Sequence, residues 1–238
     1  MDPLPQIETA LRASFLFPVL TPNERRRFLD SARPKSWRAD DLIFSMGDPG
    51  NAMMVVQSGK IRISYPAADG RVMLLGDLGP GGVFGEIALL DGGDRSADAT
   101  ALTDCTLLVF QRRAFTDLLE GNALLVDAVL KLICSRLRTS DERMAELAFA
   151  DLPSRLAKIL LARARPTAQG GPRCVDDTQS ALAGFVGGSR ENINRCLRRW
   201  AKAELVAISE GRIILLDLDG LRRAVGWTRP NPGREGWD

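Results

Sequence analysis

Residues 81–97 read Gly-Gly-Val-Phe-Gly-Glu-Ile-Ala-Leu-Leu-Asp-Gly-Gly-Asp-Arg-Ser-Ala. This stretch places carboxylates, one guanidinium and one hydroxyl in a glycine-rich segment that also carries apolar side chains. Glycine lets backbone N–H groups approach a phosphate closely, and a guanidinium can fork onto its oxygens. Arg95, Ser96 and Ala97 are therefore candidates to hold a phosphate, while Glu86 would repel it and suits a sugar hydroxyl. The alternative is a surface hairpin with a structural Glu–Arg pair.

The surrounding residues 36–110 carry short runs in which apolar and polar side chains alternate. Turn signals rich in glycine, proline, aspartate and serine separate these runs. Regular short strands with such turns predict an antiparallel roll or barrel, with residues 81–97 between its later strands. We expect the strands at residues 41–45, 52–56, 59–65, 72–76, 99–102 and 105–110.

Residues 1–40 are predicted to be helical. The Thr-Pro-Asn-Glu sequence at residues 21–24 supplies an N-cap, a first-turn proline and a capping-box glutamate. The three arginines at residues 25–27 would suit either a nucleic-acid patch or a solvated helix face, and a solvated face is the more common origin of such a run.

From residue 112 the period changes to that of a helix. Its apolar stripe advances in alternating steps of four and three, which is a heptad pattern with one polar interruption at Ser140. Packing on the roll would explain part of this stripe, but its regular narrow spacing favours a second copy of the chain as partner. The stripe comprises Leu119, Ala123, Val126, Leu130, Ile133, Leu137, Ser140, Met144 and Leu147.

The Ala-Asp-Leu-Pro sequence at residues 150–153 marks a boundary, because Asp151 can cap a new helix whose first turn accepts Pro153. A polar loop is expected at residues 165–172. Thr178 then caps a short helix over residues 179–186, followed by a Gly-Gly turn.

A second helix follows the turn, with Ser189 as its cap. Helix, glycine turn and helix together predict a helix-turn-helix unit. One face of the second helix is apolar, and the opposite face is rich in arginine, which suits either solvent or the DNA major groove. The preceding short helix favours DNA, and a hairpin over residues 205–215 is expected as a wing. The polar face carries Arg190, Glu191, Asn194, Arg195, Arg198 and Arg199.

The Phe-Gly-Glu and Arg-Ser-Ala sequences within residues 84–97 resemble the phosphate-binding cassette of cyclic-nucleotide-binding domains. The resemblance implies that Gly85 and Glu86 hold the ribose, and that Arg95 and Ser96, with Ala97, hold the cyclic phosphate. It also implies a jelly-roll-like domain.

The long helix resembles the dimer helix of the cyclic-AMP receptor protein (CRP/FNR) superfamily of bacterial transcription regulators. Aligned through the shared Leu147-Ala148-Phe149 segment, Ser140 and Asp141 fall on the Thr-Ser pair that reaches the purine in that family. Arg136 falls on an arginine that pairs with the ribose-binding glutamate. Asp141 departs from the family serine, and a carboxylate can accept from adenine or from guanine N–H groups. The choice between cyclic AMP (cAMP) and cyclic GMP (cGMP) therefore stays open.

The helix-turn-helix region resembles the Ser-Arg-Glu-x-x-x-Arg recognition helix of the same superfamily. By position, Arg190, Glu191 and Arg195 would read base edges, and Ser189 and Arg198 would hold backbone phosphates. The implied partner is double-stranded DNA with a palindromic operator, bound by a homodimer. RNA polymerase is the expected further partner.

Composition narrows the function classes. The chain has 238 residues, 45% of them hydrophobic, and a formal net charge of +2, so a nucleic-acid surface must be a local patch. It has no histidine, which excludes histidine triads, histidine-ligated zinc and histidine-ligated haem. The four separated cysteines at positions 105, 134, 174 and 196 form no Cys-x-x-Cys pair, and no iron–sulfur cluster, haem or metal is expected. Neither a membrane-length apolar run nor an export pattern is present, so a cytoplasmic location away from membranes is expected.

Together these patterns predict an α+β protein that is not an enzyme. We expect an N-terminal cyclic-nucleotide-binding β-roll at residues 1–111, a long dimerisation helix and hinge at 112–150, a winged helix-turn-helix domain at 151–225 and a tail at 226–238. Ligand would reset the dimer helices and the hinge at residues 149–151. The alternatives are a relative that binds DNA without ligand or senses another signal, and a regulatory subunit of an enzyme.

Overall fold

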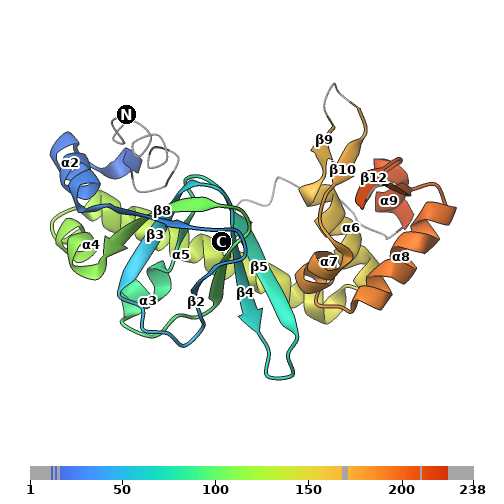
Figure 1. Cartoon of the computed structure of the whole chain (residues 1–238), viewed down its shortest axis with the longest axis horizontal. Helices are drawn as coiled ribbons and strands as arrows, with labels where there is room; N and C mark the ends of the chain where they lie inside the picture. Colours follow the sequence, from blue (N-terminus) through green and yellow to red (C-terminus); the bar gives the residue numbers. More distant parts are fainter. Residues whose placement is uncertain (1–11, 13, 15–16, 168–170, 210, 225–238) are drawn as a thin grey trace, which may run out of the picture. The chain divides into compact units, whose positions relative to one another are not determined.

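A computed structural model describes residues 12, 14, 17–167, 171–209 and 211–224 (Figure 1). The chain divides into two compact units, residues 1–141 and residues 142–238. Helix α5, Ala123–Phe149, runs across this boundary. Within the described ranges, no helix combines the length and apolar character that crossing a membrane requires.

Two four-stranded antiparallel sheets form the body of the first unit, as the alternating sequence pattern predicts. The strands are β1 (Arg33–Trp37), β2 (Leu42–Phe44), β3 (Ala52–Ser58), β4 (Ile61–Pro66), β5 (Val72–Leu78), β6 (Val83–Phe84), β7 (Asp98–Ala101) and β8 (Cys105–Gln111). One sheet has the order β1-β8-β3-β6 and the other β2-β7-β4-β5. The expected roll is therefore confirmed, with the short strand β6 leading into the glycine-rich stretch.

Strand β1 corrects the prediction that residues 1–40 are helical. It pairs with β8 from Arg33 opposite Val109 to Trp37 opposite Cys105. Pro34 cannot donate a backbone hydrogen bond, which an edge strand tolerates because one of its sides has no neighbour. Pairing with β8 determines that this segment is a strand, and the local sequence preferences of its residues do not predict that pairing.

Strand β3 is buried along both faces, which explains its continuous Ala-Met-Met-Val-Val sequence. Met53 and Val55 belong to a core that also contains residues of the helices, whereas Met54 and Val56 belong to a second core with side chains from β4, β6, β7 and β8. Each side chain of this size contributes about 1.5–3 kcal/mol when it is fully buried. Strand β3 therefore contributes side chains to both hydrophobic cores.

Helices cover one side of the roll: α2 (Pro22–Ser31), α3 (Glu86–Asp91), α4 (Arg112–Leu119) and α5, with a 3-10 turn at Phe17–Val19. The predicted capping box is confirmed, because Thr21 accepts from the backbone N–H of Glu24 while the Glu24 carboxylate accepts from that of Thr21. Phe28 of α2 stacks on Phe110 of β8 with ring centroids 4.0 Å apart. This contact fixes α2 on the roll.

The helix expected from residue 112 onward is interrupted once, at residues 120–122. Gly121 adopts a φ of 86°, which L side chains rarely adopt, and Asn122 accepts a hydrogen bond of 2.9 Å from the backbone N–H of Leu125. Leu119 therefore ends α4 and is not part of the α5 stripe. The remaining stripe residues lie on one continuous helix.

The second unit combines helices α6 (Leu152–Arg163), α7 (Gln179–Val186), α8 (Arg190–Lys202) and α9 (Leu218–Ala224) with a four-stranded sheet. The sheet has the order β11-β12-β10-β9, from strands β9 (Arg165–Pro166), β10 (Arg173–Val175), β11 (Val206–Ser209) and β12 (Arg212–Leu215). The β11–β12 hairpin is the predicted wing. The core contains Leu160, Leu182, Leu197 and Trp200.

Residues 165–172 are not wholly a loop, because β9 and β10 pair with each other and extend the wing sheet. Arg165 lies opposite Cys174, and Val175 lies opposite Ile213 of β12. Two-residue strands carry too short an alternation to be detected in sequence. Glu210, within the expected wing hairpin, and the tail at residues 226–238 fall outside the described residues.

The last turns of α5 are tied to α6 and α7 within the second unit. Arg155 donates to the carbonyl oxygen of Ala150 at 2.6 Å and to that of Val186, at the end of α7, at 2.9 Å. Glu146 of α5 forms an ion pair with Lys158 of α6. The segment that was expected to act as a hinge is thus bonded to the first helix of the helix-turn-helix.

Candidate functional sites

Gly85 makes the sharp turn from β6 into α3. Its φ is 73°, and a Cβ at this position would lie 2.5 Å from Nη1 of Arg95. The backbone conformation therefore favours glycine, and a Cβ would also displace the Arg95 guanidinium. The turn places Glu86 at the first position of α3, where the positive end of the helix dipole favours a carboxylate.

Glu86 is a buried carboxylate, with 2% of its surface exposed. It forms an ion pair with Arg136 of α5 across 2.5 Å, and Arg136 also donates to the carbonyl oxygen of Val83 at 2.7 Å. Burial raises the pKa of Glu86, whereas the charges of Arg136 and Arg95 act in the opposite direction. Its Oε2 atom is buried without a hydrogen-bond partner among the described residues. A ligand hydroxyl could satisfy that oxygen.

Arg95 is the second buried charge of the site, with 6% of its surface exposed. Its Nη1 donates to the Gly85 carbonyl oxygen at 2.8 Å, and its guanidinium carbon lies 4.3 Å from the centroid of the Phe44 ring. Burial lowers the pKa of Arg95, and the charges of Asp48 and Glu86 oppose this change. Its Nε–H is buried and has no partner in the described part of the chain. A buried donor of this kind suits an anionic oxygen.

The loop that carries Arg95 is held by backbone hydrogen bonds. Arg95 N–H donates to Asp48 and its carbonyl oxygen accepts from Gly47, each at 2.8 Å. Ser96 is exposed and Ala97 is buried. The structure brings Gly85, Glu86 and Arg95 together, and Arg136 forms an ion pair with the Glu86 carboxylate.

Ser140 and Asp141 lie on α5 beyond Arg136, and both are exposed. Ser140 is four residues after Arg136, so it shares the same face of the helix one turn further on. Asp141 is the next residue. The predicted purine-binding pair therefore follows, along one helix, the arginine that pairs with Glu86.

Two residues of the pocket were not predicted. The ring of Phe44 makes a cation–π contact with the Arg95 guanidinium. Arg112 donates to the carbonyl oxygens of Ala88 at 2.7 Å and Gly50 at 3.3 Å, and these bonds hold the end of α3. Phe44 is one of many apolar residues in an alternating strand, and Arg112 is one of 32 basic residues. Only their tertiary contacts distinguish them.

The helix-turn-helix of the second unit forms as the sequence predicts. Thr178 accepts from the Ala181 backbone N–H to cap α7, and Ser189 accepts from that of Asn192 to cap α8. Gly187 ends α7 with a φ of 65°. The apolar face of α8 is buried through Ile193, Cys196, Leu197 and Trp200.

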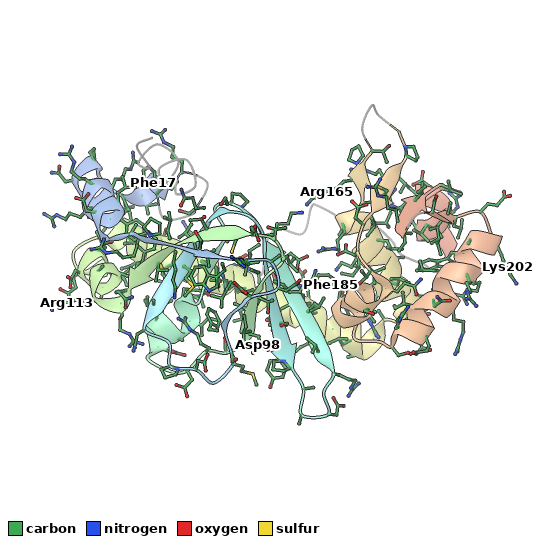
Figure 2. The ribbon with its side chains drawn as sticks, viewed as in Figure 1. Phe17, Asp98, Arg113, Arg165, Phe185 and Lys202 are labelled. Atoms are coloured by element: carbon green, nitrogen blue, oxygen red, sulfur yellow. The ribbon has the colours of Figure 1, made fainter. Side chains whose placement is uncertain are left out.

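The opposite face of α8 is exposed and basic. Figure 2 shows its side chains standing away from the ribbon, with Lys202 labelled near the end of the helix. Asn194 donates to the Gln179 side chain of α7 at 2.9 Å, which links the two helices. An open hollow on this face is lined by Gln179, Arg190, Glu191, Asn194, Arg195, Arg198, Arg199 and Lys202.

This face can both donate and accept. A hydrogen bond from its own backbone N–H, and then one from Ser189, lower the pKa of Glu191, so its carboxylate stays charged as an acceptor. Arginine donors beside one carboxylate acceptor are the groups that read guanine and cytosine edges in the major groove. The predicted DNA-contact residues Ser189, Arg190, Glu191, Arg195 and Arg198 are all exposed on this side of the unit.

Comparison with known proteins identifies both units. Residues 34–122 match the cyclic nucleotide-binding domain, and residues 154–224 match the Crp-like helix-turn-helix domain. The chain is thus a transcription regulator with a nucleotide-binding domain and a DNA-binding domain, and its domains and relatives are not those of enzymes.

The chain belongs to the CRP/FNR family of transcription regulators. It is 33% identical over 203 residues to the cyclic AMP receptor protein of Thermus thermophilus, covering 85% of this chain and 93% of the relative. It is 29% identical over 221 residues to a CRP-like cAMP-activated global transcriptional regulator of Mycobacterium tuberculosis, covering 91% and 99%. Among solved structures, the c-di-GMP responsive regulator CLP of Xanthomonas campestris shares the fold, with a TM-score of 0.74, 22% identity, and coverage of 82% and 99%.

Proposed function

We propose that this protein is a homodimeric, cytoplasmic transcription regulator that cAMP switches into a DNA-binding state. The observation that carries the proposal is a pair of buried groups without hydrogen-bond partners in the described part of the chain: Oε2 of Glu86 and Nε–H of Arg95, whose guanidinium bonds to Gly85, the residue before Glu86. A cyclic nucleotide offers a ribose hydroxyl as donor and a phosphate anion as acceptor, which matches one acceptor and one cationic donor. Ser96 would add a hydroxyl, and Gly85 and Ala97 would add close backbone approach.

The purine end would be read by Ser140 and Asp141. A serine hydroxyl can donate or accept, and an ionised carboxylate only accepts, so Asp141 suits the amino group of adenine and also the N–H groups of guanine. The Mycobacterium and Thermus relatives are named for cAMP, which supports cAMP as the first candidate. cGMP is the second candidate, because the Asp141 carboxylate of this chain could also accept from guanine.

A second copy of the chain would cover the α5 stripe. Leu130, Leu137 and Met144 are 58–61% exposed in the single chain, although they are large apolar residues. Their heptad spacing fits a twofold helix pair. The dimer would present two α8 helices to half-sites about 34 Å apart on a palindromic operator. The hinge at residues 149–151 and contact with RNA polymerase belong to the same proposal.

Titration of the full-length protein tests the function. Calorimetry would measure cAMP, cGMP and cyclic di-GMP binding, while fluorescence anisotropy follows a palindromic operator duplex at the same ligand concentrations. We expect cAMP or cGMP to bind and to increase operator affinity, because a switch requires different ligand affinity in its two states. Operator binding that is unchanged by every nucleotide would instead identify a ligand-independent regulator.

Replacing Leu137 with aspartate is expected to convert the dimer into monomers at micromolar concentration. Twofold symmetry would bury two like charges in the helix seam, which costs several kcal/mol. Sedimentation velocity measures the change. Leu124→Asp is the matched control, because Leu124 is 67% exposed on the same helix but lies off the heptad stripe. A Leu137→Asp protein that remains dimeric would refute this interface.

A further inference from the structure

We propose that Phe44 is a positioning residue that holds the Arg95 guanidinium ready for the anion, an inference that rests on the proposed function. The guanidinium carbon of Arg95 lies 4.3 Å from the centroid of the Phe44 ring. A cation at this distance from an aromatic face is attracted by the ring quadrupole, most strongly where water is excluded. Arg95 is buried, so this contact is of the stronger kind.

Phe44 is itself held in place by Phe84, which lies next to the candidate site. Its ring packs against Phe84, with centroids 5.8 Å apart and an interplanar angle of 31°. Phe84 directly precedes Gly85, whose carbonyl oxygen accepts from Arg95 Nη1. Phe44 therefore contacts residues on both sides of α3: Phe84 before the helix and Arg95 after it.

Together these contacts restrict a side chain that is otherwise mobile. Free arginine has many rotamers, and fixing them on ligand binding weakens affinity. The ring contact and the Gly85 bond both fix the guanidinium, while its Nε–H is buried without a partner among the residues that the structure describes. Phe44 acts through Arg95, whereas Arg95 would contact the anion directly.

The aromatic ring, and not only its volume, is required by this proposal. Leucine or methionine at position 44 would keep an apolar side chain in the core but remove the ring quadrupole. Tyrosine would keep the ring at position 44, which is only half-buried. The aliphatic and aromatic variants therefore separate positioning from packing.

The test is calorimetric titration of full-length wild-type protein, Phe44→Leu, Phe44→Met and Phe44→Tyr with cAMP and cGMP, together with thermal unfolding of each protein. We expect both aliphatic variants to bind the accepted nucleotide roughly 5–20-fold more weakly, and Phe44→Tyr to bind within about twofold of wild type. Ile43→Ala is the control, because Ile43 packs in the same core on the same strand. It should lower the unfolding temperature but leave affinity within about twofold.

Two outcomes overturn the role of Phe44 alone: wild-type affinity in either folded aliphatic variant, or equal weakening in Phe44→Tyr and Phe44→Leu. If Phe44→Leu does not fold, Phe44→Met decides, because methionine adapts to irregular core space. Wild-type protein that binds neither nucleotide would overturn the proposed function and this inference together, so the two failures are distinguishable.

Discussion

Replacing Arg95 with glutamine is expected to weaken cyclic-nucleotide binding by about a hundredfold or more and to abolish ligand-dependent operator binding. Hydrogen bonds to charged groups contribute about 1.5–3 kcal/mol, and removing one partner also leaves the phosphate unneutralised in a buried pocket. Arg95 supplies the buried cationic Nε–H, and glutamine replaces it with a neutral amide. Calorimetry and operator anisotropy, run in parallel, measure the two effects.

The control for this experiment is Arg71→Gln. Arg71 belongs to the same unit, and its side chain is 82% exposed in an ion pair with Asp69. It should bind nucleotide as wild type does, because surface ion pairs contribute little. Thermal unfolding checks that the Arg95 variant is folded despite losing its bond to Gly85. Equal ligand-driven operator binding by wild type and Arg95→Gln would contradict the assigned pocket.

Replacing Arg195 with alanine should leave nucleotide affinity within about twofold of wild type and reduce operator affinity by roughly 30-fold or more. A bidentate arginine–guanine contact contributes about 1–3 kcal/mol of discrimination, and a dimer makes it twice. Arg195 is exposed on α8 and lines its basic hollow. Anisotropy with the operator and with a scrambled duplex separates lost specificity from lost general affinity.

Arg223→Ala provides the matched comparison for Arg195. Arg223 lies on α9 of the same unit, with 74% of its side chain exposed. Both changes remove one exposed positive charge, so Arg223→Ala reports how much of the Arg195 effect comes from lost charge alone. If Arg195→Ala retained full preference for the operator, α8 would not be the helix that reads base edges there.

Sequence reasoning could predict those parts of the two sites that lie in short, chemically unusual segments. Gly85, Glu86 and Arg95 fall within eleven residues, and the caps and glycine turn of the helix-turn-helix also depend on neighbouring residues. These features follow local rules of backbone conformation, capping and charge. The structure has the helix caps and the glycine turn of the helix-turn-helix in the predicted places, and it buries both Glu86 and Arg95.

What the sequence could not predict depends on contacts between distant segments. Strand β1 forms because β8 pairs with it, although its own residues include a proline. Phe44 contacts Arg95 across fifty-one positions, and Arg112 reaches Ala88 across twenty-four. Alternation along a strand can predict that a phenylalanine faces inward, but it cannot predict which cation the ring contacts.

Arg155 joins the end of α5 to the end of α7 with a single side chain. The planar guanidinium donates to one carbonyl oxygen on each segment, so the end of α5 and the end of α7 cannot shift far independently of each other. A rotation of α5 that displaced Ala150 would therefore also displace Val186 and the glycine turn that follows it, because one rigid side chain couples the two.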